Sequence, residues 1–340
     1  MLVEEIAMRM GEPLRDKWGR MHTRLRISVT DRCNSRCVYC MPGREVVFRP
    51  RGALLTFEEI ERFVRVLAGL GIRRIRLTGG EPLVRVGIDR LVGSLARVPG
   101  IEDLALTTNG RLLGSWVAAL KRAGLQRLNI SLDAMDEASF RRISRRGGLQ
   151  QVLDGIFAAR QCGFEQIRLN AVALRGLTEE QAVPLAAFAR RHDLELRFIE
   201  YMPLDGQGVW QANQVLCGEE IRGLLETRFG PLVLAPRPDP SQPAVDYRFA
   251  DGRGRIGFIS SLSHPCCGTC NRLRLTAEGQ LRNCLFAGGE FDVRAILRGG
   301  GSDRQVTALV RECLACKQAE PGIASPTFLP PAHAMYQIGG

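Results

Sequence analysis

The sequence contains no long hydrophobic run. Its apolar stretches are only a few residues long, whereas a helix that crosses a bilayer needs about 20 apolar residues. The first residues include Glu4 and Glu5 and lack the apolar segment that a signal peptide carries. We therefore expect a cytoplasmic protein that does not enter a membrane.

Aromatic residues are also scarce, at 6% of the chain. They do not alternate with basic residues, as they do in surfaces that stack single-stranded nucleic acid. The net charge is nevertheless +11, which indicates an anionic partner such as nucleic acid, a membrane surface or a phosphorylated small molecule. The densest basic run, residues 141–146, is interpreted as an exposed helix face. Charge alone therefore does not identify the partner.

Cysteine, in contrast, is abundant. In a reducing cytosol the eleven cysteines are more plausible as metal ligands than as disulfides. Six of them form two groups of three: Cys33, Cys37 and Cys40, then Cys267, Cys270 and Cys284. A 4Fe-4S cluster held entirely by protein needs four thiolates, so three leave one iron open. On spacing alone, the second group could instead be closed by His264 or Cys266 into a structural zinc site.

The chain from residue 24 to about 200 alternates short β-rich runs with helical patterns. The predicted strands are 25–30, 74–78, 103–107, 127–132, 166–172 and 194–200. Strands separated by helices build right-handed βαβ units with a parallel sheet. Because six strands are too few for a closed eight-stranded barrel, we predict an α/β fold with a partial (β/α)6 TIM-like barrel. Function in such folds lies at the C-terminal ends of the strands.

Local signals define some helices and a division of the chain. Thr56 and Glu59 form the pattern of a capping box, and residues 178–181 repeat it. Five prolines between 231 and 243 follow a helix predicted near 218–229. We therefore predict a barrel over residues 1–230 and a C-terminal cluster domain over 245–340. Cys313 and Cys316 are one helical turn apart and have no partner pair of cysteines, so we interpret them as structural or incidental.

The first cysteine loop leads to a family. Cys33-x3-Cys37-x2-Cys40, followed one βα unit later by Gly79-Gly80-Glu81-Pro82, resembles the radical S-adenosylmethionine (SAM) enzymes. The resemblance implies a 4Fe-4S cluster on Cys33, Cys37 and Cys40, with SAM on its open iron and a 5′-deoxyadenosyl radical as the product of its cleavage. It also implies SAM contacts at Tyr39, Gly80, Ser131 and Met202.

The surroundings of the second cysteine group narrow this resemblance. The runs 24–33, 257–261, 270–276 and 283–286, with the terminal Gln337-Ile338-Gly339-Gly340, are similar to the GTP 3′,8-cyclase family of molybdenum-cofactor biosynthesis. The similarity extends from about residue 13 to 340. It implies a second 4Fe-4S cluster on Cys267, Cys270 and Cys284, whose open iron binds the guanine of GTP. The implied GTP contacts are Arg26, Arg76, Thr107, Arg168, Arg272, Leu273 and Arg274. The implied catalytic residues are Arg26, Arg272, Arg274, Gly339 and Gly340.

The activity that this resemblance implies is the conversion of GTP to (8S)-3′,8-cyclo-7,8-dihydroguanosine 5′-triphosphate, started by removal of the C3′ hydrogen. It further implies an electron donor such as flavodoxin or ferredoxin, delivery of the product to cyclic pyranopterin monophosphate synthase, and no nucleic-acid partner; a homodimer is left open. Arg74 and Arg168 replace family lysines, which changes a point charge to a planar fork. The alternatives are a peptide- or RNA-modifying radical enzyme and a zinc-containing nucleic-acid-binding protein.

Overall fold

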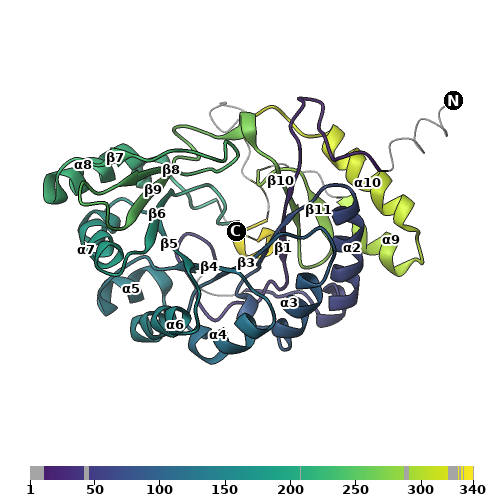
Figure 1. Ribbon diagram of the computed structural model, residues 1–340, viewed down its shortest axis with the longest axis horizontal. Coiled ribbons are helices and arrows are strands. Elements are labelled where there is room, and N and C mark those ends of the chain that lie inside the picture. The colour runs from purple at the N-terminus through teal and green to yellow at the C-terminus, as the bar shows by residue number, and fades with distance from the viewer. Residues whose placement is uncertain are drawn as a thin grey trace.

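The computed structural model describes residues 11–41, 46–206, 208–286, 291–320, 328, 331 and 333–339. These residues form one sheet of 12 strands with helices along its outer side (Figure 1). The strand order is β12-β11-β10-β1-β2-β3-β4-β5-β6-β9-β8-β7. Within the described residues, no helix has the length and apolar character needed to cross a bilayer.

The six central strands are parallel and follow one another in sequence order. They are β1 (Arg24–Ser28), β2 (Arg74–Thr78), β3 (Asp103–Thr108), β4 (Arg127–Ser131), β5 (Gln166–Ala173) and β6 (Glu195–Glu200). The helices between and after them are α2 (Phe57–Gly69), α3 (Ile88–Ala96), α4 (Leu113–Arg122), α5 (Glu137–Ser144), α6 (Leu149–Gln161), α7 (Thr178–Arg191) and α8 (Gly218–Phe229). This arrangement confirms the predicted partial barrel, whose strands all lie within two residues of the predicted positions.

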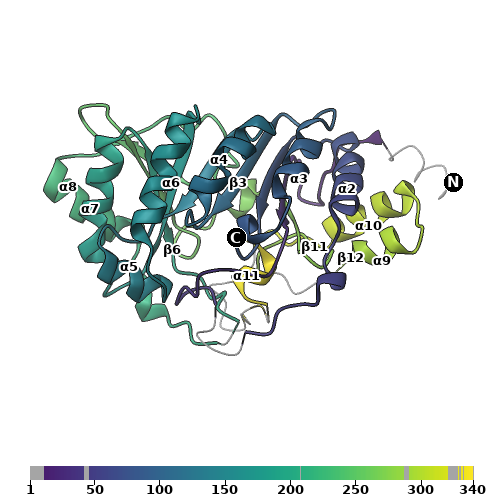
Figure 2. The same ribbon diagram turned by 90° about the horizontal axis from the view of Figure 1, so that it is seen from below.

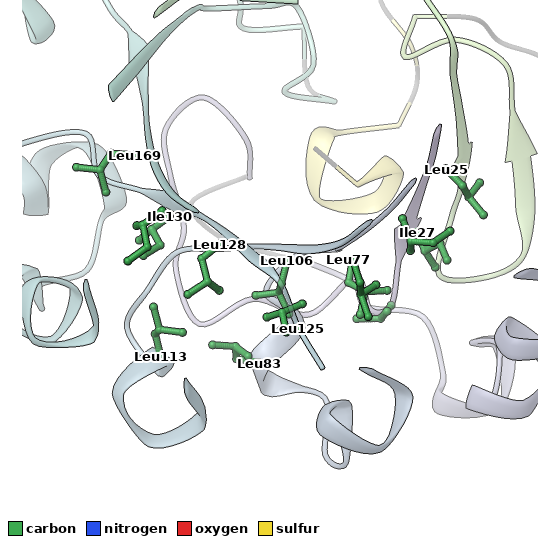
Figure 3. Packing of buried hydrophobic residues seen from close by; sticks show 14 of the residues in the cluster. Leu25, Ile27, Leu77, Leu83, Leu106, Leu113, Leu125, Leu128, Ile130 and Leu169 are labelled. Carbon is green, nitrogen blue, oxygen red and sulfur yellow. The ribbon is translucent and has the colours of Figure 1, made fainter. Parts of the chain in front are cut away.

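The core lies between the sheet and these helices. Figure 2 shows α2, α3, α4, α6 and α7 side by side along the outer surface of the sheet. Figure 3 shows Leu77 and Leu106 of the strands together with Leu113 of α4, all fully buried. Each fully buried leucine contributes roughly 1.5–3 kcal/mol to stability. The apolar helix faces therefore hold the strand ends, and the loops that follow them, in fixed positions.

The two predicted capping boxes have different outcomes. Thr56 Oγ1 accepts a hydrogen bond from Glu59 N at 3.2 Å and Glu59 Oε2 accepts one from Thr56 N at 2.7 Å, which confirms the first box. The second prediction is wrong, because α7 begins at Thr178 itself and Leu177 occupies its N-cap position. The buried Thr178 hydroxyl instead donates to Val172 O and accepts from Leu174 N, so it ties the helix to the end of β5.

The remaining strands extend the sheet at both edges. On one side β10 (Arg272–Leu275) pairs in parallel with β1, and β11 (Gln280–Arg282) and β12 (Phe291–Asp292) follow. On the other side β9 (Arg255–Ile259) pairs in parallel with β6, and β8 (Val245–Arg248) and β7 (Val233–Leu234) follow. The division at 230–245 stays a prediction, and the strands on its C-terminal side continue the barrel sheet.

Short elements complete the fold. In the described part of the chain, the single turns of 3-10 helix are η2 (Arg51–Ala53), η3 (Pro82–Val84), η4 (Ala212–Gln214) and η5 (Cys267–Thr269), and the further helices are α9 (Val293–Arg298), α10 (Asp303–Ala315) and α11 (Met335–Ile338). Cys313 is buried within α10 and Cys316 is exposed at its end, as expected for residues without a metal partner pair. Arg141 and Arg142 are exposed on α5, which confirms the interpretation of the basic run.

Candidate radical and nucleotide site

The first three thiols lie on the loop that leaves the C-terminal end of β1. Burial raises the pKa of Cys33 to about 11 and that of Cys40 to about 12. The thiolates of Cys33 and Cys40 also raise the pKa of Cys37, in addition to burial and Asp133, so the three sulfurs act on one another electrostatically. Buried thiols that resist ionisation alone are converted to thiolates when iron replaces their protons. The donor set therefore fits a cluster with one iron left open.

The Gly79-Gly80-Glu81 turn is hydrogen-bonded to the residues that lead into this loop. A Cβ at Gly79 would lie 2.5 Å from Thr30 O, and one at Gly80 would lie 2.4 Å from Arg32 O. Gly80 N donates to Thr30 O at 2.7 Å, and Glu81 N donates to Arg32 O at 2.8 Å. Glycine is therefore required at both positions because the two backbones approach so closely. This requirement holds whether or not Gly80 contacts SAM.

Glu81 connects this turn to the end of β3. Its buried carboxylate accepts hydrogen bonds from Leu83 N at 3.0 Å, Thr108 Oγ1 at 2.8 Å and Asn109 N at 2.7 Å. The Asn109 side chain in turn donates to Asn34 Oδ1 at 2.7 Å, within the cysteine loop. From the sequence, Glu81 was named only as part of the Gly-Gly-Glu-Pro motif and Asn109 was not singled out, and the glutamate in this turn was the available signal.

Tyr39 is fixed by an aspartate that sequence reasoning missed. Tyr39 Oη donates to Asp133 Oδ2 at 2.7 Å, and Asp133 Oδ1 accepts from Val172 N at 2.8 Å. Burial raises the pKa of Asp133 to about 6, against the lowering effect of these two hydrogen bonds. An acidic residue two positions after a buried strand was the signal that could have revealed it. Tyr39 thereby presents its ring in one orientation beside the cysteine loop.

One cavity of about 240 Å³ joins the residues expected around SAM with those expected around the nucleotide. From the first set it is lined by Tyr39, Ser131 and Met202. From the second set it is lined by Arg26, Thr107, Cys267, Cys270, Arg272, Arg274 and Cys284. The structure therefore brings to one space residues that lie more than 200 positions apart in the chain. Gly80 and the first three cysteines are not among the residues that line it.

The second three thiols face this cavity from η5 and the segment after β11. Arg272 Nε lies 3.4 Å from Cys270 Sγ, and Arg272 Nη2 lies 3.5 Å from Cys266 Sγ. Burial raises the pKa of Cys270, but Arg272 and Lys317 outweigh it and lower the pKa to about 6. Burial and the neighbouring thiolates raise the pKa of Cys267 to about 12. Cationic neighbours thus favour the thiolate of Cys270, whereas Cys267 resembles the first thiol group and would lose its proton when iron binds.

The alternative fourth ligands of the second group differ in position. Cys266 lines the cavity beside Cys267, whereas His264 is exposed and does not line it. Among the described residues, no three cysteine, histidine or acidic side chains surround a position for one metal ion. The assignment of a cluster therefore rests on the number and chemistry of the thiols.

A second cavity, of about 370 Å³, continues from the first into the barrel. Arg26, Thr107 and Arg272 line both cavities, and Arg24, Arg74, Arg76, Arg127, Arg168 and Arg197 line the second. Burial and neighbouring arginines lower the pKa of Arg26 and of Arg76. Within the part of the chain that the structure describes, the buried Thr107 hydroxyl has no hydrogen-bond partner. Concentrated positive charge with an unused hydroxyl fits a polyanionic ligand.

Some of these arginines already have carboxylate partners. Arg74 Nη1 donates to Asp239 Oδ2 at 2.8 Å, and Arg24 contacts the same oxygen. Arg168 Nε donates to Glu195 Oε2 at 2.7 Å. The structure thus places Arg74 and Arg168 in the cavity wall, held by acids, and their contact with phosphate stays a prediction.

Alternate residues of the strand β10 point to the cavity and to the hydrophobic core. Arg272 and Arg274 both line the first cavity, as their alternation predicted. Leu273 lies between them and is 0% exposed, packed in the hydrophobic core. Its side chain is therefore directed away from the expected nucleotide, because neighbouring strand residues point to opposite faces. Only its backbone remains as a candidate contact.

The C-terminal segment enters the barrel. Gly339 O accepts a hydrogen bond from Arg274 Nη1 at 2.6 Å. A Cβ at Gly339 would lie 2.9 Å from Thr78 Cγ2 and 3.0 Å from Ser28 Cβ, at the C-terminal ends of β1 and β2. Figure 1 accordingly shows the yellow ribbon of the last described residues on the concave side of the sheet. Gly340 lies outside the described residues.

Comparisons with known proteins agree with this geometry. The sequence model of the radical SAM superfamily matches residues 27–189, and the one described as Molybdenum Cofactor Synthesis C matches residues 194–322. A crystal structure of Streptococcus suis SuiB bound to S-adenosylmethionine superposes with a TM-score of 0.61 at 16% identity, covering 86% of this chain and 68% of that one. This likeness shows the fold alone.

Relatives in sequence are much closer. The GTP 3′,8-cyclase of Rhodopirellula baltica is 50% identical over 328 residues, which cover 96% of this chain and 91% of the relative. The GTP 3′,8-cyclase of Moorella thermoacetica is 43% identical, over 96% of this chain and 100% of the relative. At such identity and coverage, this chain belongs to the GTP 3′,8-cyclase family within the radical SAM superfamily.

Proposed function

We propose that this protein converts GTP to (8S)-3′,8-cyclo-7,8-dihydroguanosine 5′-triphosphate by joining ribose C3′ to purine C8, a step of molybdenum-cofactor biosynthesis. The observation that carries the proposal is the single cavity lined by both Tyr39 and Cys270. A substrate in this cavity is within reach of the SAM side and of the second thiol group. Nearly full-length relatives bear the name of this activity.

The cofactors are two 4Fe-4S clusters and SAM. Cys33, Cys37 and Cys40 would hold the first cluster, and Cys267, Cys270 and Cys284 the second. When bound, the first cluster and SAM supply a 5′-deoxyadenosyl radical, to which ribose C3′ loses its hydrogen. The protein's own part is to orient the reactants and to exclude water from the cavity, since a radical reacts with whatever lies nearest.

The arginines are proposed to bind the triphosphate. Arg26 and Arg76 are partly buried and lie side by side in register on β1 and β2, and the buried Arg274 is opposite Arg26 on β10. Guanidinium groups match phosphate oxygens in bidentate pairs and stay charged when buried. Binding a polyanion would also relieve the repulsion among these cations, which is the physical reason to expect high affinity for a triphosphate over a neutral nucleoside.

The tail is proposed to complete the site. Gly339 is held by Arg274 next to the ends of β1 and β2. This hydrogen bond fixes the orientation of the Arg274 guanidinium. Arg274 and its neighbours Arg26 and Arg272 would then present a constant geometry to the nucleotide, on which reaction rates depend strongly.

Partners and location beyond the substrate are inferred from the reaction class. The reductive step needs an external one-electron donor such as flavodoxin or ferredoxin, and the cyclised nucleotide is passed on to cyclic pyranopterin monophosphate synthase. We place the protein in the cytoplasm, where thiols stay reduced. We also propose residues 245–340 as the unit that bears the second cluster, joined to residues 1–230 by the proline-rich stretch.

An anaerobic incubation with SAM, a reductant and one nucleotide at a time tests the proposal. We expect 5′-deoxyadenosine and a new nucleotide triphosphate from GTP, and neither above background from GDP, ATP or an RNA stem-loop. Modification of the RNA or of an added peptide, with GTP recovered unchanged, would favour the hypothesis of a peptide- or RNA-modifying radical enzyme. Zinc in place of iron and sulfide would favour the nucleic-acid-binding reading.

A further inference from the structure

A buried lysine touches the second thiol group from outside the cavity. Lys317 follows α10, is 3% exposed, and is not among the residues that line either cavity. Its Nζ lies 3.6 Å from Cys270 Sγ, 3.0 Å from Arg272 O and 2.7 Å from Asn283 O. An ammonium group has three donors, so these contacts use all of them. Lys317 therefore has a single defined orientation.

The charge of this ammonium is compensated in an unusual way. A buried cation is costly unless an anion or several hydrogen bonds offset its desolvation. Among the described residues, no carboxylate forms an ion pair with Lys317, and its remaining contacts are neutral carbonyls. The anionic partner that the described residues offer is the sulfur of Cys270. The position is thus matched to a thiolate and not to a carboxylate.

The N-terminal segment clamps the peptide that carries this lysine. Trp18 Nε1 donates to Lys317 O at 3.0 Å, and Arg20 Nη2 donates to Gln318 O at 2.7 Å. Arg20 Nη1 also donates to Cys267 O at 2.8 Å. One guanidinium therefore joins the peptide after Lys317 to the backbone of a second-group cysteine, across almost the whole length of the chain.

The clamp is itself fixed by buried polar contacts. Asp16 Oδ2 accepts from Arg20 Nε at 2.6 Å and lies 3.0 Å from His22 Nε2. Asp16 Oδ1 accepts from the backbone N–H groups of Trp18 and Arg20. Asp16, Arg20 and His22 are all buried. So many satisfied contacts in one short segment hold Arg20 and the Lys317 backbone in place.

We infer that Lys317 is a positioning residue for the second cluster, held against Cys270 by the Trp18–Arg20 clamp. The inference rests on the cluster that the proposed function assigns to Cys267, Cys270 and Cys284. Donors to ligand sulfurs and nearby charge set the reduction potential and the retention of an iron–sulfur cluster. A fixed positive charge at Cys270 stabilises the more negative, reduced state and anchors this ligand. Removal of the charge lowers the potential and loosens the iron.

The test uses the full chain with Cys33, Cys37 and Cys40 replaced by alanine, so that only the second group is loaded with iron and sulfide. In this background Lys317→Met keeps the aliphatic stem and removes the charge, and Lys317→Arg keeps the charge. Lys17→Met is the matched control, because Lys17 is an exposed lysine beside the same clamp. Iron release to a chelator and the midpoint potential of the cluster are measured without SAM or GTP.

Lys317→Met is expected to release iron about tenfold faster, the lower bound usual for lost outer contacts of metal ligands, and to shift the potential to more negative values. Lys317→Arg should restore much of the potential, and Lys17→Met should match the parent. Trp18→Phe, which removes only the indole donor, should shift iron release in the same direction by less, and it serves if Lys317→Met does not fold.

Unchanged iron release and potential in Lys317→Met would overturn the inference. So would an Lys317→Arg variant with the potential of Lys317→Met, because the role would then be packing alone. Since no nucleotide is present, these outcomes do not depend on GTP being the substrate. A parent that binds no iron at the second group would contradict both the inference and the proposed function.

Discussion

Arg274 Nη1 donates a hydrogen bond to Gly339 O at 2.6 Å across 65 residues of chain. Arg274 comes from β10, which pairs with β1, and Gly339 lies against the ends of β1 and β2. The contact therefore places the C-terminal tail among the arginines expected to hold the nucleotide. Gly339, which composition alone would assign to a frayed end, is thus held by an arginine of the cavity wall.

Deletion of Gly339 and Gly340 should impair cyclisation far more than stability. The deletion removes the described hydrogen bond from the charged Arg274, worth roughly 1.5–3 kcal/mol, so in a chain of this length the melting temperature should fall by only a few degrees. Without the tail, Arg274 is no longer held, and we expect continued SAM cleavage with little or no cyclised nucleotide. Product chromatography at matched iron content makes the measurement. Normal cyclisation by the truncated protein would show that the tail has no part in the site.

Gly339→Ala should have a similar effect without shortening the chain. Its φ is +86°, and a Cβ would lie 2.9 Å from Thr78 Cγ2, so the tail must move. We expect cyclisation to fall by at least tenfold while SAM cleavage persists. Gly223→Ala is the matched control, because its Cβ meets nothing within 4 Å. Equal loss of cyclisation in both variants would contradict this explanation.

The two thiol groups should have separable roles. Cys37→Ala should abolish reductive cleavage of SAM while GTP still binds, since Cys37 belongs to the loop next to Tyr39. Cys270→Ala should weaken GTP binding and cyclisation and leave some uncoupled release of 5′-deoxyadenosine. Both variants are assayed for iron, GTP affinity and 5′-deoxyadenosine. Loss of cleavage in both, with the untouched group loaded, would refute the separation.

The arginines of β10 should bind GTP more strongly than surface arginines of the same charge. A charge-assisted hydrogen bond contributes roughly 1.5–3 kcal/mol, so Arg272→Ala or Arg274→Ala should raise the GTP dissociation constant about tenfold or more. Arg141→Ala is the control, because this side chain is 69% exposed on α5. Isothermal titration at fixed salt measures the affinities. An equal effect of all three substitutions would indicate general electrostatics and not a site.

His22 should contribute stability that is lost on mild acidification. Burial, Lys317 and Arg20 lower the pKa of His22 from 6.5 to about 4, against the raising effect of Asp16. Between these values the unfolded chain takes up a proton on His22 that the folded chain does not. The contribution of His22 is therefore fully present above pH 6.5 and is lost as the pH falls toward 4, by about 3 kcal/mol in total.

Burial raises the pKa of the Glu81 carboxyl to about 7 and that of Asp133 to about 6, and these groups act in the opposite sense over the same window, so His22 is tested by comparison with His22→Gln. Urea unfolding of both apoproteins between pH 7 and 4.5 makes the measurement, and as the pH falls the wild type should lose more stability, or gain less, than His22→Gln. Asp16, whose pKa is lowered to about 2, contributes only at lower pH. If the wild type and His22→Gln lost the same stability over this range, another group would be responsible.

The barrel could be predicted from the sequence because its signals are local. Each central strand is a short β-rich run next to an amphipathic helix, and Thr56 has its cap partner Glu59 three residues later. Thr178 begins the same type of sequence pattern, but its hydroxyl is buried against the end of β5. A tertiary hydrogen bond therefore replaces the local cap. The two thiol groups could also be recognised from the sequence, because the spacing of their cysteines is visible there.

The supporting contacts of the site could not be predicted in the same way. Tyr39 meets Asp133 across 94 residues, and Lys317 meets Cys270 across 47. No sequence motif marks Asp133 or Lys317 as a partner. Both contacts form because the packing of helices and strands brings distant loops together. For Leu273 the resemblance implied a contact with GTP, because the residue lies within the family motif. The structure instead directs its side chain into the core, because neighbouring strand residues point to opposite faces.

The most direct test of the central claim follows one hydrogen atom. GTP carrying deuterium at C3′ is incubated anaerobically with the protein, SAM and a reductant, and both products are analysed by mass spectrometry. The proposed reaction moves the deuterium to 5′-deoxyadenosine, which gains one mass unit, and yields a nucleotide triphosphate that has lost the label and is an isomer of unlabelled GTP. Unlabelled 5′-deoxyadenosine together with GTP that keeps its deuterium would contradict the assignment.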